Sequence, residues 1–153
     1  MSDFNFEGEF ESVDFLTESA EQTRLFASKF AKILPEDSFI AFSGDLGTGK
    51  TTFVKGLAEG LGVKATVKSP SFNVMSVYDV DTGLKLVHID AYRLSSPEDF
   101  ENLLIDEIAP TPRCVCVEWW SNIADCVPTD AYEVIMSIED DTRHKISIRR
   151  GIR

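Results

Sequence analysis

The segment from residue 44 to residue 51 reads Gly-Asp-Leu-Gly-Thr-Gly-Lys-Thr and fits the pattern G-x-x-x-x-G-K-[ST]. Glycines let successive backbone N–H groups converge on phosphate oxygens, and a helix that begins there adds a favourable potential for anions. Lys50 supplies a positive charge for the β- and γ-phosphates, and the Thr51 hydroxyl is a hard oxygen ligand for Mg²⁺. The segment therefore predicts a phosphate-binding P-loop.

Two carboxylates have positions that suit a nucleotide site. Asp90 follows the apolar run 84–89, and Glu118 follows the apolar run 114–117. In open α/β sheets ligands bind at the carboxyl ends of the strands, so both acids are candidates for holding Mg²⁺ and orienting water. Each acid could instead cap a helix or face solvent, and the sequence leaves these alternatives open.

The cysteines favour packing over metal binding. Cys114 and Cys116 are two residues apart in an apolar run, so they point to the same side of the predicted strand. His88 and His144 are isolated, and no Cys/His pair lies at zinc spacing. We expect buried structural thiols.

The elements around the P-loop can be placed from local patterns. A strand at Phe39–Phe42 precedes it, and a helix from about Thr51 to Glu59 follows it, closed by Gly60 and Gly62. An earlier helix begins at a capping box, with Ser19 as N-cap and Gln22 three residues on. Its apolar residues recur at helical spacing as far as Leu34, and 35–37 end it.

The remaining pattern mixes βα units with hairpins. Residues 10–16 alternate weakly, as in an edge strand, and Ser96-Pro97 begins a helix. Strands are expected at 72–78 and 84–89 (joined by a turn at 81–83), at 114–117, and at 132–138 and 144–149. This order predicts an α/β fold: a three-layer P-loop NTPase-like domain with a mixed, partly parallel sheet and flanking helices, spanning residues 1–153.

Composition narrows the class of partner. The chain has 15 Lys+Arg against 26 Asp+Glu, a formal net charge of −11, so any contact with nucleic acid is expected to run through a partner protein. Bases gather only near the end, over 143–153. The apolar runs are too short to span a bilayer, and the first residues lack a secretory pattern. We expect a cytoplasmic protein without a membrane role.

Four blocks of the chain resemble one known family, the TsaE ATPases of bacterial tRNA threonylcarbamoyladenosine synthesis. They are the P-loop with Thr52, Val67-Lys68-Ser69-Pro70-Ser71-Phe72, His88-Ile89-Asp90-Ala91-Tyr92-Arg93-Leu94, and Glu118-Trp119. The likeness covers nearly the whole chain, and the second and third blocks make it specific.

The resemblance implies a role for each matching residue. Thr51 and Glu118 would be ligands of Mg²⁺, and Asp90 would be essential for hydrolysis, with Lys50 and Glu118 beside it in the catalytic set. Residues 68–71 would form a switch-like loop that responds to nucleotide. The residues expected to contact ATP are Ser19, Gly47, Thr48, Gly49, Lys50, Thr51, Thr52 and Arg143.

The family also implies a partner, the TsaD–TsaB pair, which transfers threonylcarbamoyl to a tRNA adenosine. Hydrolysis of ATP would reset that complex between rounds, and the chain would meet tRNA only indirectly. The sequence departs from the family pattern at Ser71, where Thr is usual, at Val77, where an acid is usual, and at Leu104, where Gly is usual. The last departure puts a local turn in question.

Two other functions compete with a partner-stimulated ATPase. A nucleotide-gated adaptor, in which ATP only sets the shape of the loop 68–72, would use the same residues. A small P-loop kinase would need a substrate domain or a lid, for which 153 residues leave little room. The N-K-x-D and D-x-x-G motifs of GTPases do not occur in the sequence, so ATP is favoured over GTP.

Overall fold

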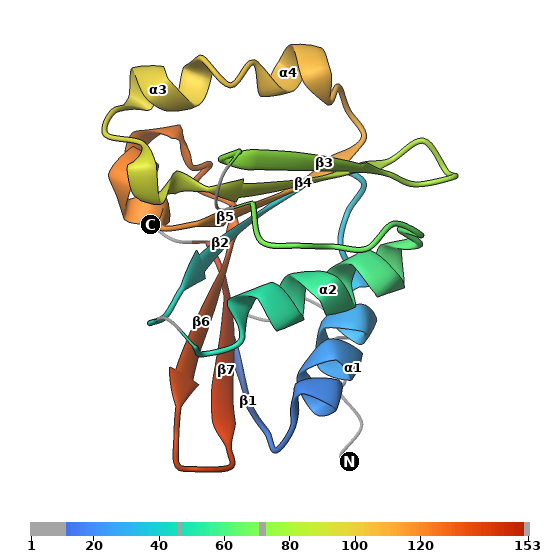
Figure 1. Cartoon of the computed structure of the whole chain (residues 1–153), viewed down its shortest axis with the longest axis vertical. Coiled ribbons are helices and arrows are strands. Elements are labelled where there is room, and N and C mark those ends of the chain that lie inside the picture. The colour runs from blue at the N-terminus through green and yellow to red at the C-terminus, as the bar shows by residue number, and fades with distance from the viewer. Residues whose placement is uncertain (1–11, 46, 71–72, 152–153) are drawn as a thin grey trace.

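A computed structural model describes residues 12–45, 47–70 and 73–151. Its centre is a sheet of seven strands in the order β1-β7-β6-β2-β5-β4-β3 (Figure 1). The strands are β1 (Ser12–Thr17), β2 (Ser38–Ser43), β3 (Met75–Asp79), β4 (Lys85–Asp90), β5 (Arg113–Glu118), β6 (Tyr132–Ile138) and β7 (His144–Arg150).

Strand direction divides the sheet into a parallel centre and antiparallel margins. β2 runs parallel to β5 and β6, and β4 runs parallel to β5. Hairpins add β3 to β4 and β7 to β6, and β1 pairs antiparallel with β7. The mixed sheet confirms the expected fold class, and it brings the carboxyl ends of β2, β4, β5 and β6 to one edge.

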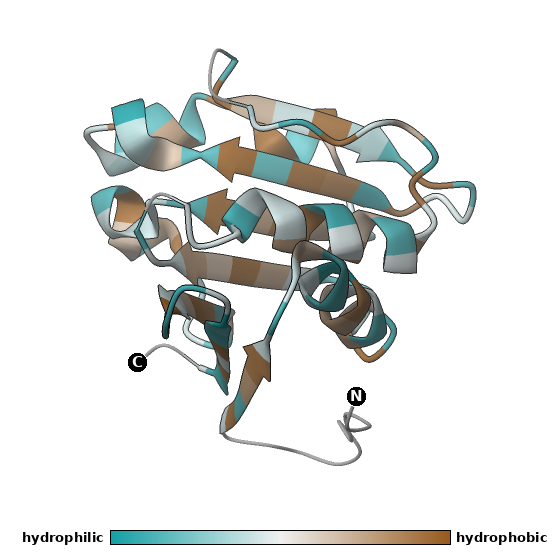
Figure 2. Ribbon diagram, turned by 60° about the horizontal axis from the view of Figure 1, so that its bottom comes forward, coloured by the Kyte–Doolittle hydropathy of each residue, from teal (hydrophilic) through white to brown (hydrophobic). Residues whose placement is uncertain are grey.

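Two apolar clusters, one on each face of the sheet, make the fold three-layered. On one face α1 (Ala20–Ala31) and α2 (Lys50–Leu61) cover β2, β5, β6 and β7, with Phe26, Phe30 and Phe53 fully buried. The other face packs against η1 (Ala91–Arg93), α3 (Pro97–Glu101), α4 (Ile105–Ile108) and η2 (Trp120–Cys126). Figure 2 shows hydrophobic colour along the strands and mixed colour on the helices. Among the described residues, no helix combines the length and the hydropathy that crossing a membrane requires.

The first helix begins as predicted and ends earlier than predicted. The Gln22 backbone N–H donates to Ser19 Oγ at 3.1 Å, which confirms the N-cap. The helix stops at Ala31, with Lys32 as C-cap, so Ile33 and Leu34 lie beyond it and Ile33 is exposed. Leu34 lies in the connecting segment but packs against the same apolar cluster as Phe26 and Phe30. The apolar pattern of the sequence therefore extends beyond the end of the helix.

The second helix corrects a prediction about glycine. α2 runs through Gly60, and only Gly62, with φ of +95°, caps it. A Cβ on Gly56 would lie 2.3 Å from the Arg24 carbonyl oxygen, and one on Gly60 would lie 2.4 Å from the Ser28 carbonyl oxygen. Gly60 is therefore not a helix stop: together with Gly56 it lets α1 approach α2 closely.

The strand predicted at 72–78 begins only at Met75, because Asn73 and Val74 lie in a turn where both backbone N–H groups donate to the Pro70 carbonyl oxygen. Several other local predictions agree with the structure. The β3–β4 hairpin turns at 81–83, Ser96 caps α3, and the strand of residues 12–17 is an edge strand; residues 10, 11 and 72 lie outside the described ranges. Cys114 and Cys116 are buried on the same face of β5, and burial raises the pKa of the Cys116 thiol well above its ordinary value. These thiols are packing residues, as expected.

Candidate nucleotide-binding site

The P-loop joins the end of β2 to the start of α2. Gly44 has φ of +142°, and a Cβ there would lie 2.4 Å from the Met136 carbonyl oxygen, so β6 leaves room only for glycine. Gly49 has φ of +103° at the N-cap of α2. The left-handed residue turns the chain directly into the helix, whose first N–H groups then face the loop.

Lys50 lies inside the loop. Its side chain donates from Nζ to the Gly44 carbonyl oxygen at 2.5 Å, and the residue is only 7% exposed. The ammonium also lies 5.0 Å from the ring centroid of Trp119. On the same loop Thr48 Oγ1 donates to the Asp45 carbonyl oxygen at 2.8 Å. The lysine is therefore held across the mouth of the loop, where a phosphate oxygen would compete with a carbonyl for it.

The two candidate acids lie on neighbouring strands beside the P-loop strand. Glu118 pairs in register with Phe42 of β2, and Asp90 pairs in register with Glu118. Because side chains alternate along a strand, both acids share the face of α1 and α2 with Leu86 and Cys116. The edge thus presents the end of β2, then Glu118, then Asp90.

Asp90 also has a local structural role. Its Oδ1 accepts a hydrogen bond from the Tyr92 backbone N–H at 3.0 Å and so caps η1. Its own backbone N–H donates to the Val74 carbonyl oxygen at 2.8 Å. Capping was the alternative to a functional role, and the geometry shows that Asp90 caps a helix while lying at the candidate site.

His88 is a residue of the site that sequence reasoning missed. It is fully buried, and its Nε2 lies 2.7 Å from Glu118 Oε2, which is itself nearly buried. Sequence spacing treated His88 as isolated because its partner is 30 residues away. The available signal was the alternation of β4, which places His88 on the same face as Asp90.

Trp119 and Trp120 lie beside the end of β2. Trp119 has φ of +58°, and its ring meets Tyr92 edge-on at 5.2 Å between centroids. Trp120 donates from Nε1 to Ser43 Oγ at 2.9 Å. Both line a cavity of about 490 Å³ with Gly44 and Lys50, bounded on the far side by the end of β6. The aromatic pair therefore forms one wall beside the P-loop.

Residues that flank Ser19 lie near Arg143 at the same edge of the sheet. Glu18 and Gln22, on either side of Ser19, line a cavity of about 720 Å³ together with Arg143. Arg143 donates from Nε to Asp140 Oδ2 at 2.7 Å, and hydrogen bonds from Arg143 lower the pKa of Asp140 to about 2. Ser19 Oγ and Arg143 both have structural partners within the chain.

The hairpin that carries Arg143 also reaches the P-loop. A Cβ on Gly49 would lie 3.7 Å from His144 Nδ1 and 3.3 Å from Met136 Cε. Spacing arguments assigned His144 no role. His144, the first residue of β7, therefore lies directly beside Gly49, the N-cap of α2.

The switch-like loop, residues 68–71, contacts the sheet through Lys68, and its Pro70 carbonyl oxygen accepts a hydrogen bond from the Val74 backbone N–H at 2.9 Å. The Lys68 backbone N–H donates to the Tyr78 hydroxyl at 3.2 Å, and Val74, with φ of +64°, accepts from Asp90. Ser71 and Phe72 lie outside the described residues. The loop therefore contacts β3 directly and Asp90 by way of Val74.

The donor atoms at the edge fit Mg²⁺. Thr51, at the second position of α2, offers a hydroxyl oxygen, while Glu118 and Asp90 offer carboxylate oxygens. Within the described ranges no three His, Cys, Asp or Glu side chains gather as a metal-enclosing group. Mg²⁺ is typically held by one or two carboxylates together with substrate phosphates, so a sparse set of hard oxygens suits it.

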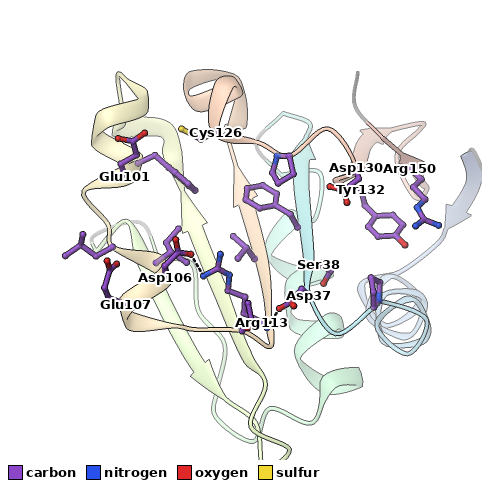
Figure 3. A pocket seen from close by; sticks show the side chains of 18 residues that line it. Asp37, Ser38, Glu101, Asp106, Glu107, Arg113, Cys126, Asp130, Tyr132 and Arg150 are labelled. Atoms are coloured by element: carbon purple, nitrogen blue, oxygen red, sulfur yellow. Dashed lines mark hydrogen bonds and ion pairs between the residues drawn. The ribbon is translucent and has the colours of Figure 1, made fainter.

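A different cavity, of about 620 Å³, lies at the opposite edge of the sheet (Figure 3). It lies between α3, α4 and the first residues of β2, β5 and β6, and Arg113 in its wall pairs with Asp106 at 2.6 Å. None of the residues predicted for the nucleotide site lines it. The chemistry-bearing residues therefore gather at the carboxyl edge.

The fold and this edge together define an α/β protein of the P-loop NTPase-like class. Residues 17–147 match the model of the family described as "Threonylcarbamoyl adenosine biosynthesis protein TsaE". The chain therefore belongs to the TsaE family, which confirms the resemblance drawn from the four sequence blocks.

Similar proteins support this assignment over most of the chain. A tRNA threonylcarbamoyladenosine biosynthesis protein TsaE of Treponema pallidum is 34% identical over 134 residues, covering 87% of this chain and 97% of that protein. One of Aquifex aeolicus is 36% identical over 142 residues, covering 90% and 96%. A crystal structure of Bacillus subtilis YdiB superposes with a TM-score of 0.77 at 28% identity, covering 95% and 89%.

Proposed function

We propose that this chain binds ATP with Mg²⁺ at the P-loop and hydrolyses it slowly. The observation that supports this most strongly is that the P-loop follows β2 while Glu118 and Asp90 end the adjacent strands β5 and β4, all at one edge of the sheet. A loop that binds phosphate needs such acids nearby before hydrolysis is possible.

Each residue of the edge has a role in this proposal. Lys50 leaves the Gly44 carbonyl for a phosphate oxygen, and the N–H groups from Gly47 to Thr52 hold the phosphates. Thr51 and Glu118 hold Mg²⁺, which when bound neutralises phosphate charge. Asp90 orients water or the metal shell, and Ser19 and Arg143 contact the rest of the nucleotide.

The family name supports a biological role for this ATPase. We assign it to threonylcarbamoyl transfer to tRNA adenosine, where hydrolysis resets a TsaD–TsaB-like complex in the cytoplasm. The net charge of −11 disfavours direct binding to a phosphate backbone, so tRNA is reached through the partner proteins.

One observation favours a second candidate, the nucleotide-gated adaptor. The Val74 backbone N–H donates to the carbonyl oxygen of Pro70 in the switch-like loop, and the Val74 carbonyl oxygen accepts from the Asp90 N–H, so backbone hydrogen bonds connect the loop to the site. A nucleotide that moves Asp90 therefore changes the segment whether or not it is hydrolysed. The two candidates differ in whether phosphate release accompanies the response of the partner.

The decisive experiment measures ATP binding by calorimetry and phosphate release with and without TsaD–TsaB. Lys50→Ala is expected to abolish binding, while Asp90→Asn and Glu118→Gln should bind ATP but lose partner-stimulated release by about 10²-fold or more. Asp106→Asn, an exposed acid at the opposite edge, is the matched control and should behave as the parent chain.

Each result separates the candidates. Wild-type turnover in Asp90→Asn or Glu118→Gln would remove the assigned role of that acid. Partner binding that depends on ATP without any phosphate release would favour the adaptor. Normal ATP affinity in Lys50→Ala would reject the P-loop as the binding site.

A further inference from the structure

One buried polar contact at the site connects a side chain of no assigned role to the candidate metal ligand. His88 is fully buried on β4, and its Nε2 lies 2.7 Å from Oε2 of Glu118 on β5. The two side chains come from adjacent parallel strands whose register places Cys116 opposite His88. Sheet pairing therefore fixes the contact, and no loop rearrangement is needed to make it.

The surroundings of the ring determine which nitrogen carries the hydrogen. A carboxylate oxygen accepts hydrogen bonds, so His88 Nε2 must donate. His88 Nδ1 is buried and has no hydrogen-bond partner among the residues that the structure describes. The tautomer with its hydrogen on Nε2 leaves only a lone pair unpartnered at Nδ1, whereas the other tautomer would bury an unpaired N–H.

The hydrogen bond commits one of the two carboxylate oxygens of Glu118. Oε2 keeps a second lone pair, but a cation bound by both oxygens would have to share Oε2 with the His88 N–H, so Oε1 is the favoured ligand atom. Mg²⁺ requires near-ideal octahedral geometry with few protein ligands, whereas Ca²⁺ takes more oxygens and often binds a carboxylate through both. A carboxylate restricted in this way favours the smaller cation.

We infer that His88 is a positioning residue that restricts Glu118 to one-oxygen metal binding and thereby makes the site select Mg²⁺ over Ca²⁺. The inference rests on the proposed role of Glu118 as a metal ligand. It concerns the choice of cation, which neither the P-loop nor the fold determines. His88 is a polar ring at a fully buried strand position, and among the described residues Glu118 is the one hydrogen-bond partner of its side chain.

The test measures binding of ADP, without turnover, in Mg²⁺ and in Ca²⁺, and compares the ratio of the two affinities. In His88→Leu, which removes the donor and keeps similar bulk, the preference for Mg²⁺ should fall by about 10-fold. His88→Gln places an amide N–H where Nε2 lies and should restore the ratio. Val87→Ala, a buried neighbour on the opposite face of β4, controls for lost packing and should leave the ratio unchanged.

The outcomes distinguish this inference from the proposed function. An unchanged ratio in His88→Leu, with normal Mg²⁺ dependence in the parent chain, overturns the role of His88 alone. Nucleotide binding that ignores both cations removes the metal site and the inference together. A ratio that falls equally in Val87→Ala shows a packing effect and also overturns it.

A measurement on the unaltered protein covers the case in which His88→Leu does not fold. Long-range ¹H–¹⁵N spectra of the imidazole rings report which nitrogen carries the hydrogen, with His144, the other histidine of the chain, as an internal reference. The hydrogen is expected on Nε2 of His88 before and after addition of Mg²⁺ and ADP. A hydrogen on Nδ1, or a bond that is lost when both are added, overturns the inference.

Discussion

Three residues with side chains adopt a backbone conformation that is usually reserved for glycine. Val74, Leu104 and Trp119 all have positive φ, a conformation that favours glycine. Val74 and Trp119 lie beside Asp90 and Glu118, where the strain helps to shape the candidate site. Leu104 lies far from it, with φ of +56° and ψ of +46° at the start of α4, and 53% of the residue is exposed.

The sequence left open whether a turn forms at Leu104, and the structure shows that one does. The backbone at this position is left-handed, the conformation that glycine favours, although leucine carries it. A left-handed L-residue costs roughly 1–2 kcal/mol, which exceeds the entropic cost of glycine by a small margin. Leucine at this position therefore strains the turn.

Replacing this leucine should reveal the strain. We expect Leu104→Gly to leave the free energy of unfolding unchanged or to raise it by about 0.5 kcal/mol. The same change at Leu103, which packs partly against the second apolar cluster, should lower it by about 2 kcal/mol. Urea unfolding of both variants gives the comparison, and equal losses at the two positions would contradict the assignment of strain to Leu104.

At the scale of elements, the packing of α1 on α2 holds the P-loop helix against the sheet. Gly56 and Gly60 bring the two helix backbones close, and an ion pair between Arg24 and Glu59 spans the surface of the same contact. Because α2 begins at Lys50, a shift of this helix moves the residues that would hold phosphate. Helix packing is thus linked directly to the geometry of the site.

A methyl group at Gly56 should separate the helices. Although alanine is the better helix former by about 1 kcal/mol, its Cβ would meet the Arg24 backbone at 2.3 Å and Ala27 Cβ at 2.7 Å. We expect Gly56→Ala to lower the free energy of unfolding by about 2 kcal/mol and to weaken nucleotide binding. Lys55→Ala, on the exposed side of α2, should change it by less than about 0.5 kcal/mol. A stabilised Gly56→Ala variant, measured by denaturant unfolding, would refute the close approach.

At the scale of the whole molecule, the candidate site gathers residues from most of the sheet. It draws on α2, β4 and β5, and the β6–β7 hairpin carries Arg143 and His144 to the same edge. A ligand bound at this edge therefore contacts segments that are far apart in the sequence. Its binding free energy should stabilise the entire fold rather than one loop.

Thermal unfolding can measure this stabilisation. At a nucleotide concentration about 100 times Kd, binding contributes about 2.7 kcal/mol, which for a chain of this size corresponds to a rise in Tm of roughly 5–10 °C. The rise should require Mg²⁺ and should disappear in Lys50→Ala. Scanning calorimetry with and without ligand checks it, and a Tm that ignores the nucleotide in the parent chain would argue against the proposed site.

Local signals in the sequence predicted those features whose causes are local. The P-loop, the Ser19 cap, the Ser96 cap and the alternation of the hairpin strands depend on residues within a few positions of one another. Strand order depends on pairings across the chain and was not predicted. The same reason hid the contact between His88 and Glu118, because only the register of β4 against β5 brings them together. Gly60 was misassigned because a glycine near a helix end serves as a cap more often than as a packing surface.

The position of the Lys50 ammonium over the indole of Trp119 has a practical consequence. A positive charge close to an indole alters its emission, and a ligand that draws Lys50 away from the Gly44 carbonyl changes that charge's distance from the ring. If ATP binds as proposed, the intrinsic tryptophan fluorescence should therefore change on binding, and occupancy can be followed without a dye or a labelled nucleotide.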